Sequence, residues 1–125
     1  MLKAIDHVVM TVRDLGRTVR FYEQVLDVPV IRFGSDRYAL QIGAQKINIH
    51  APETEAAPKA AAPTPGGLDI CFLTEEPVSK VAQRLAERGV AIEEGPVARS
   101  GAMGRISSLY LRDPDGNLIE ISNQL

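Results

Sequence analysis

The feature of this sequence that most constrains its fold is an internal repeat. DHVVMTVRDL (6–15) resembles LDICFLTEEP (68–77) when His7 is aligned with Asp69, and each stretch is a strand-length apolar run leading into an acidic helix start. Further along the chain, RYALQIGAQKINIH (37–50) resembles SSLYLRDPDGNLIEIS (107–122) as two strands joined by a turn. A repeat of this kind predicts two copies of one supersecondary motif.

The two copies are separated by the low-complexity segment APETEAAPKAAAPTPGG (51–67). Its prolines lack backbone donors and resist regular structure, so the segment is interpreted as a linker between the two copies. A chain of 125 residues has the size of one domain. We therefore predict a single domain over 1–125, made of a module 1–50, the linker 51–67 and a module 68–125.

Each module is predicted to contain a strand, a helix and then three strands. The first helix is expected at about 14–27, where apolar residues recur at helical spacing and Asp14 is a suitable N-cap. The second is expected at about 77–88, with Pro77 at its first position and Gly89 just beyond its end.

The remaining segments are predicted to be strands and turns. Short strands are expected at about 29–33 and 90–94, and Asp-Pro-Asp-Gly at 113–116 is strong turn chemistry before the last strand. The predicted fold class is therefore α+β, with two repeated βαβββ modules.

Composition excludes several classes of protein. Apolar residues make up 45% and charged residues 24% of the chain, and the net charge is −2, so neither a nucleic-acid surface nor attraction to an anionic membrane is indicated. No apolar run reaches the roughly 20 residues of a membrane helix, and the N-terminus does not resemble a signal peptide. The single cysteine, Cys71, is typical of a reducing compartment, which predicts a cytoplasmic protein, and we expect it to be a buried apolar residue.

A polar side chain interrupts the apolar pattern of several predicted strands. Successive side chains of a strand point to opposite faces, so Glu120 lies on the face opposite Ile119 and Ile121. The same alternation places Asn48 and His50 on the face opposite Ile47 and Ile49. His7 and Asp69 take equivalent positions at the start of the first strand of each module. The polar residues assigned to this common face are His7, Asn48, His50, Asp69 and Glu120.

At both ends the sequence resembles a known family. IDHVVMTVRDLGRTVRFYEQVLDVPV (5–30) and YLRDPDGNLIEIS (110–122) are similar to the vicinal oxygen chelate superfamily, also called the glyoxalase/bleomycin-resistance/extradiol-dioxygenase family. The segments QKINIH, PTPGGLDICF and EEGPV resemble small glyoxalase-domain proteins of the virulence-associated type. The resemblance covers essentially the whole chain. It implies a cupped mixed sheet in each module, helices outside, and a divalent cation at the concave face.

In this family the cation ligands come from the first and last strands of each half and are usually His, Glu or Gln. The matching positions are His7, Asn48, Asp69 and Glu120, of which Asn48 and Asp69 depart from the usual types. His50 is expected to compensate by reaching back into the site. The resemblance thus implies a nickel, zinc, manganese, cobalt or iron site formed by His7, His50, Asp69 and Glu120. Glu120 would also act as the catalytic base, and Asn48 would contact the substrate.

The segment PVARSGAMGR (96–105) is expected to be a flexible loop. As a lid it would recruit an anionic substrate with Arg99 or Arg105; the alternative is an ordinary solvated loop. For Asp69, the alternative to a metal ligand is pairing with Arg105 or Arg112.

The leading functional hypothesis is a glyoxalase-like metal-dependent lyase or isomerase. Its cation would chelate vicinal substrate oxygens and stabilise an enediolate-like charge. One alternative is a non-catalytic drug-binding protein of the resistance type, although 5% aromatic residues and no tryptophan argue against stacking. Further alternatives are a thiol transferase or a dioxygenase. The family's habit of pairing implies a homodimer that binds a small-molecule substrate.

Overall fold

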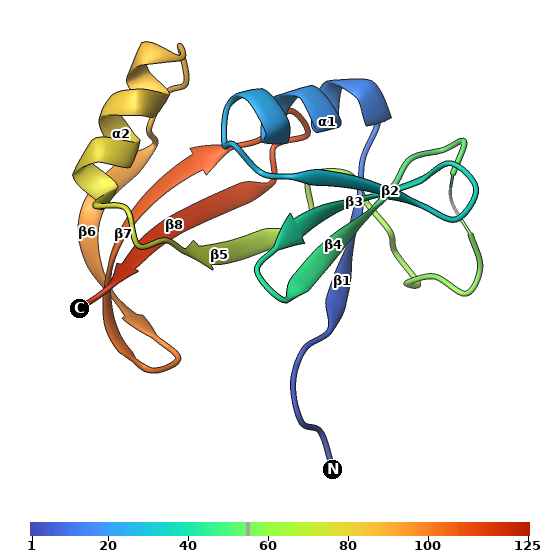
Figure 1. Cartoon of the computed structure of the whole chain (residues 1–125), viewed down its shortest axis with the longest axis horizontal. Coiled ribbons are helices and arrows are strands. Elements are labelled where there is room, and N and C mark those ends of the chain that lie inside the picture. The colour runs from blue at the N-terminus through green and yellow to red at the C-terminus, as the bar shows by residue number, and fades with distance from the viewer. Residues whose placement is uncertain (55) are drawn as a thin grey trace. The chain divides into compact units, whose positions relative to one another are not determined.

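The computed structural model describes residues 1–54 and 56–125. The chain divides into two compact units, Met1–Gly67 and Leu68–Leu125. In each unit one helix accompanies a four-stranded mixed sheet (Figure 1). Both units follow the order strand, helix, three strands, so the prediction of an α+β fold with two βαβββ modules is confirmed. No helix of the described residues has the length and apolar character needed to cross a membrane.

The first unit contains one parallel and two antiparallel strand pairs. Its elements are β1 (His7–Thr11), α1 (Leu15–Gln24), β2 (Val30–Phe33), β3 (Arg37–Ile42) and β4 (Gln45–His50). The strand order is β1-β4-β3-β2, with β1 parallel to β4. The helix is anchored on the sheet by Tyr22, whose hydroxyl lies 3.7 Å from the sulfur of Met10, and both side chains are buried.

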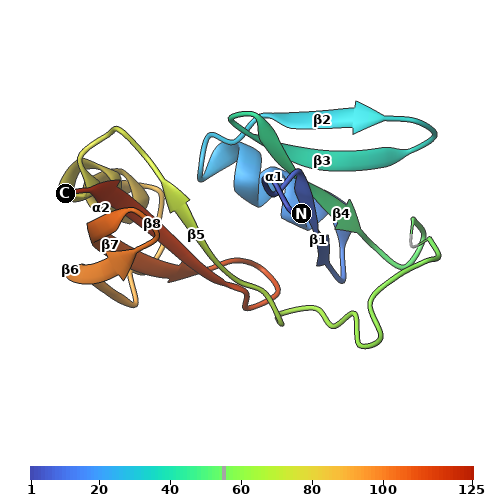
Figure 2. The same cartoon turned by 90° about the horizontal axis from the view of Figure 1, so that it is seen from below.

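The second unit repeats this topology. Its elements are β5 (Asp69–Leu73), α2 (Val78–Glu87), β6 (Glu94–Gly101), β7 (Gly104–Arg112) and β8 (Leu118–Gln124), in the order β5-β8-β7-β6. Helix α2 lies against β7 and β8 (Figure 2). Leu109, Leu111 and Ile119 are fully buried, and each contributes roughly 1.5–3 kcal/mol of transfer free energy.

Both helices begin close to their predicted start. Asp14 caps α1 with an extended backbone, and its Oδ1 accepts from the N–H of Arg17 at 2.9 Å, as predicted. Pro77 is the N-cap of α2 and not its first helical residue, because its ψ of 129° is extended. Gly89 follows α2 with a φ of +76°, a conformation that favours glycine.

The region between α2 and the last hairpin differs from the prediction. The expected strand at 90–94 and the expected loop at 96–105 are both wrong, because β6 spans Glu94–Gly101 and pairs along β7. Gly95 lies at a register shift with a φ of +105°, and a Cβ there would come within 2.3 Å of the Ser108 carbonyl oxygen. The glycines and small polar residues of this segment indicate a loop locally, whereas pairing with β7 makes it a strand.

The turn before β8 also fixes the start of β5. Asp113 Oδ1 accepts from the N–H groups of Asp115 and Asn117, both at 2.9 Å, which confirms the predicted turn. The side-chain oxygen of Asn117 then accepts from the N–H of Leu68 at 2.9 Å. The beginning of the second unit is therefore tied to its final hairpin.

Candidate functional site

In the first unit, the polar face of the sheet carries His7 and Asn48. In the parallel β1–β4 pair, His7 lies opposite Lys46 and Val9 lies opposite Asn48. Residues opposite each other share a face, so His7 and Asn48 are diagonal neighbours on one face. Met10, Ile47 and Ile49 occupy the other face and are buried.

The second unit places Asp69 and Glu120 in the same relation. Asp69 lies opposite Leu118, and Cys71 lies opposite Glu120. Glu120 thus takes the face opposite the buried Ile119 and Ile121, as the alternation predicted. Each unit presents one diagonal pair of polar side chains, His7 with Asn48 and Asp69 with Glu120.

The imidazole of His7 is held by its neighbour in the chain. Its Nδ1 lies 2.8 Å from Oδ1 of Asp6, and 44% of the His7 side chain is exposed. With the proton on Nδ1 donated to Asp6, Nε2 keeps its lone pair. A carboxylate that orients an imidazole in this way is a common feature of histidine metal ligands.

The amide of Asn48 has an unsatisfied acceptor. The residue is 5% exposed, and its Oδ1 is buried without a hydrogen-bond partner among the described residues. A buried acceptor in this state costs about 1–3 kcal/mol relative to a bonded one. Amide oxygens are ligands of divalent cations, so a cation would satisfy this atom.

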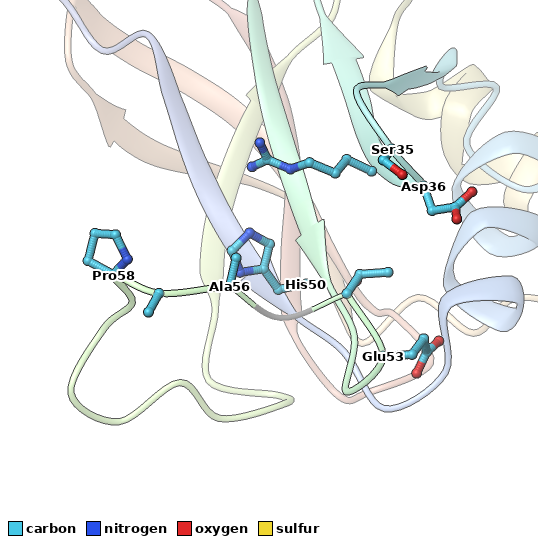
Figure 3. Close-up of a pocket in the computed structure, with 9 residues that line it drawn as sticks. Ser35, Asp36, His50, Glu53, Ala56 and Pro58 are labelled. Atoms are coloured by element: carbon cyan, nitrogen blue, oxygen red, sulfur yellow. The ribbon is translucent and has the colours of Figure 1, made fainter.

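His50 does not lie with His7. It is opposite Thr11, four residues along the strand pair from His7, which separates the two Cα positions by roughly 13 Å. Instead, His50 lines a cavity of about 600 Å³ together with Arg37, Glu53 and residues of the linker (Figure 3). The expectation that His50 reaches back toward His7 therefore finds no support in the register.

Around Glu120, the second unit forms a hydrogen-bonded cluster. Tyr110 lies directly opposite Glu120 in the β7–β8 pair. The Nε–H of Arg99 donates to the Tyr110 hydroxyl at 3.1 Å, and Nη2 of Arg99 donates to Oε1 of Glu94 at 3.0 Å. Burial raises the pKa of the Tyr110 hydroxyl. The hydrogen bond from Arg99 lowers this pKa, and the Glu120 carboxylate raises it further. Tyr110 is thus a protonated donor beside Glu120.

Cys71 also belongs to this face. It is exposed, so the expectation of a buried residue is wrong. Its Sγ lies 3.2 Å from the Ser122 hydroxyl oxygen, and Ser122 in turn lies 3.5 Å from Oε2 of Glu120. Partial burial, opposed by Ser122 and reinforced by Glu120, raises the pKa of the Cys71 thiol. A raised pKa is the reverse of what a nucleophilic cysteine requires.

The two arginines of 96–105 lie on different faces of their sheet. Arg99 is opposite Ile106, which lies on the same face of β7 as Tyr110. Arg105 is opposite Ser100 and lies on the other face of the sheet, the face that packs against α2. The structure brings Arg99 toward Glu120 and does not bring Arg105 there.

Asp69 is exposed, and its charge acts on the guanidinium of Arg112. The guanidinium of Arg112 is engaged by both carboxylate oxygens of Glu93, at 3.0 and 3.1 Å. This bond raises the pKa of Arg112, with a smaller contribution from Asp69. Asp69 itself therefore remains open to another cation.

The predicted ligands come in two pairs, one from each unit. Within residues 1–54 and 56–125, no three side chains of His, Cys, Asp or Glu form a group that could hold a metal ion. By type, the imidazole and amide oxygen of the first unit and the two carboxylates of the second are each ligands that divalent cations accept. The unsatisfied Oδ1 of Asn48 and the oriented ring of His7 fit this requirement.

Two residues near the site were missed from the sequence. Asp6 immediately precedes His7, and Tyr110 has the strand parity of Glu120 in the preceding strand. Both signals were present in the sequence, since alternation along the final hairpin places Tyr110 on the Glu120 face.

Comparisons with known proteins agree with this fold. Virulence protein STM3117 of Salmonella typhimurium is 52% identical over 122 residues, covering 98% of this chain and 85% of the relative. Its crystal structure superposes with a TM-score of 0.96, at 51% identity, over 100% of this chain and 99% of that chain. Glyoxalase domain-containing protein RDO1 of Mycosarcoma maydis is 44% identical over 98% of this chain and 69% of its own length. Glyoxylase I 4 of Arabidopsis thaliana is 32% identical over 98% of this chain and 71% of its own length.

A family model also matches nearly the whole chain, from residue 4 to residue 121. The duplicated βαβββ topology agrees with that match. This chain belongs to the Glyoxalase/Bleomycin resistance protein/Dioxygenase superfamily.

Proposed function

We propose that the protein is a metal-dependent enzyme of the lyase or isomerase type. The observation that carries this proposal is the repeated diagonal placement of His7 with Asn48 and of Asp69 with Glu120. These two pairs, one in each unit, are the candidate cation ligands, with His50 left out of the ligand set. The similarity to proteins named as glyoxalases supports the choice of chemistry.

A divalent cation held by these residues would polarise two neighbouring oxygens of the substrate and stabilise negative charge on them. The chain's own residues would move the proton. The carboxylate of Glu120 would accept a proton from a hydroxyl-bearing carbon next to a carbonyl; the C–H electron pair forms a carbon–carbon double bond, and the π pair of the carbonyl moves onto its oxygen. Glu120 would then return the proton to the former carbonyl carbon, while the hydroxyl proton of the first carbon passes to the other oxygen and a carbonyl forms at the first carbon, so no external oxidant or reductant is needed.

Tyr110 and Arg99 support Glu120 in this scheme. Because Arg99 donates to the Tyr110 oxygen, the hydroxyl hydrogen is free to donate toward Glu120. Arg99 is itself fixed by Glu94, which holds its guanidinium in place. Arg99 would also offer positive charge to an anionic substrate, whereas Arg105 lies on the other face.

Metal analysis of the purified protein tests the proposal. Wild type is expected to hold close to one equivalent of nickel, zinc, manganese, cobalt or iron after dialysis, and His7→Ala and Glu120→Gln are expected to lose it. Glu87→Gln, at the exposed end of α2, is the matched control and should keep the metal. If wild type and both variants hold the same trace metal, the enzymatic proposal fails and a non-catalytic small-molecule-binding function takes its place.

Turnover of methylglyoxal with glutathione then separates glyoxalase activity from epimerisation of a small 2-substituted acid or thioester. A loaded wild-type protein that is inactive on both substrate classes would contradict the lyase or isomerase assignment. The thiol transferase and dioxygenase alternatives would then be assayed next.

We further propose a homodimer. Val9 on β1 and Leu73 on β5 are 45% and 64% exposed, and both lie on edge strands of their sheets, where unpaired backbone groups favour association. Light scattering at micromolar concentration should give twice the chain mass, and a monomeric mass would refute this. We also propose a cytoplasmic location, based on the single cysteine, which cell fractionation tests.

A further inference from the structure

A cluster of cations lies around Phe33 on the first sheet. Phe33 and Arg37 are cross-strand partners, and the Arg37 guanidinium carbon is 4.7 Å from the ring centroid. The Lys46 ammonium is 3.7 Å from the same centroid. The strand register puts all three side chains on the face that carries His7 and Asn48.

No carboxylate among the described residues neutralises the two cations at Phe33. Several other arginines are paired with carboxylates, as Arg99 is with Glu94 and Arg112 with Glu93. Within the described part of the chain, neither Arg37 nor Lys46 forms an ion pair with a carboxylate. The two centroid distances put both charges no more than about 8.4 Å apart, where like charges repel.

An open cavity adjoins this cluster. Arg37 and His50 line it, and its volume of about 600 Å³ is within the range of small-molecule sites. In Figure 3 the carboxylates of Asp36 and Glu53 lie on the side away from His50. Asp36 is already bonded to Arg32, so of these two acids only Glu53 is left to face a ligand.

We propose that Arg37, Lys46 and Phe33 form an anion-binding subsite for the carboxylate or phosphate group of a small organic molecule. The guanidinium fork matches such oxygens bidentately, the ammonium adds a point charge, and the ring offers an apolar face to the rest of the ligand. An anion bound by both cations would also offset their repulsion. If the protein is the enzyme proposed above, this subsite implies that its substrate carries a carboxylate or phosphate group; that part of the inference rests on the proposed function.

The competing explanation is that both side chains merely cover Phe33. Lys and Arg often lay their apolar stems along an exposed ring while their charges stay in water. Arg32 provides the comparison, because it stacks on Tyr38 at 5.7 Å from the ring centroid on the opposite face of the same strands. Its charge is paired with Asp36, so it should not attract an anion.

Binding is measured on the ¹⁵N-labelled full chain, from which metal is first stripped with EDTA and the EDTA is then removed by dialysis, so that neither contributes. Inorganic phosphate and pyruvate are titrated separately, and uncharged hydroxyacetone serves as the control for pyruvate. We expect saturable shifts of the Phe33, Arg37 and Lys46 backbone amides with one or both anions and none with hydroxyacetone. Whichever anion binds more tightly identifies the preferred group. The affinity should fall as salt is raised.

Arg37→Gln and Lys46→Gln are expected to weaken anion binding about tenfold each, the size of one lost charge-assisted contact. Arg32→Gln should leave it unchanged, and circular dichroism checks that all three variants are folded. The proposal is overturned if neither anion gives saturable shifts, if the shifts map elsewhere, or if Arg32→Gln weakens binding as much as Arg37→Gln. The binding assay contains no metal, so its result does not depend on the metal analysis. If the metal analysis fails, the proposed enzyme is ruled out but the anion subsite is not; if anion binding fails, the subsite is ruled out but the proposed enzyme is not.

Discussion

The buried amide oxygen of Asn48 leads to a prediction about stability. Replacing Asn48 with Leu, a side chain of similar shape, removes an acceptor that has no partner among the described residues. A buried acceptor without a partner costs about 1–3 kcal/mol, so its removal should stabilise the fold by a similar amount. Leu is larger than Asn, and the strain of fitting it is expected to cancel up to about 1 kcal/mol of this stabilisation. We therefore expect Asn48→Leu to raise the free energy of unfolding of the metal-free protein by roughly 1–2 kcal/mol.

Asn117 provides the matched control for this substitution. It is 1% exposed, and both ends of its amide are satisfied: Oδ1 accepts from Leu68 and Nδ2 donates to Asp113 at 2.8 Å. Asn117→Leu removes these bonds and leaves two partners unsatisfied. It should lower the free energy of unfolding by roughly 2–4 kcal/mol.

Urea denaturation followed by circular dichroism, with EDTA present, measures both changes. Repeating the measurement with excess metal should stabilise wild type, because ligand binding to the folded state adds to its stability, and should stabilise Asn48→Leu less. If Asn48→Leu destabilises the metal-free protein as strongly as Asn117→Leu does, the amide oxygen of Asn48 is satisfied in solution and our reasoning is wrong.

Four further predictions concern the second unit. Glu120→Gln should lower the pKa of Tyr110, because it removes the negative charge that disfavours the tyrosinate form. Ultraviolet absorbance follows the tyrosine titration, and Tyr110→Phe shows which transition belongs to Tyr110. An unchanged titration would show that Glu120 does not act on Tyr110. As pH rises past the ordinary tyrosine pKa, the unfolded chain loses this proton first, so the wild-type protein should lose stability there. Cys71, whose thiol pKa is raised, should react with iodoacetamide at neutral pH more slowly than glutathione does, and a faster rate would contradict its assigned environment. Gly95→Ala should cost at least about 1–3 kcal/mol in urea denaturation, since its Cβ would meet the Ser108 carbonyl; an unchanged midpoint would refute the close approach.

Much of the fold follows from local patterns in the sequence. Asp14 marks the start of α1, Gly89 follows the end of α2, and the Asp113 turn forms where its residues indicate. Alternation alone separated Glu120 from its buried neighbours Ile119 and Ile121. These features depend on residues close together in the chain, which is why pattern and periodicity suffice.

The errors arise where distant residues decide the structure. Strand β6 was predicted as a loop because its composition is weak for a strand, and only its partner β7 makes it one. Cys71 was predicted as buried from its residue type, yet strand parity places it beside Glu120. His50 was grouped with His7 by face alone, and the register shows how far apart they lie along that face.

The parallel pairing of each unit's first and last strands has a consequence for biosynthesis. The first unit has all its strands once residue 50 has left the ribosome, so its sheet is able to close while the rest of the chain is still being made. In the second unit, β5 pairs only with β8, so the strand that carries Cys71 waits without a neighbour until residues 118–124 have been translated. During that interval β5 is an unprotected edge with an exposed thiol, and it is there that a nascent chain of this protein is most open to wrong pairing.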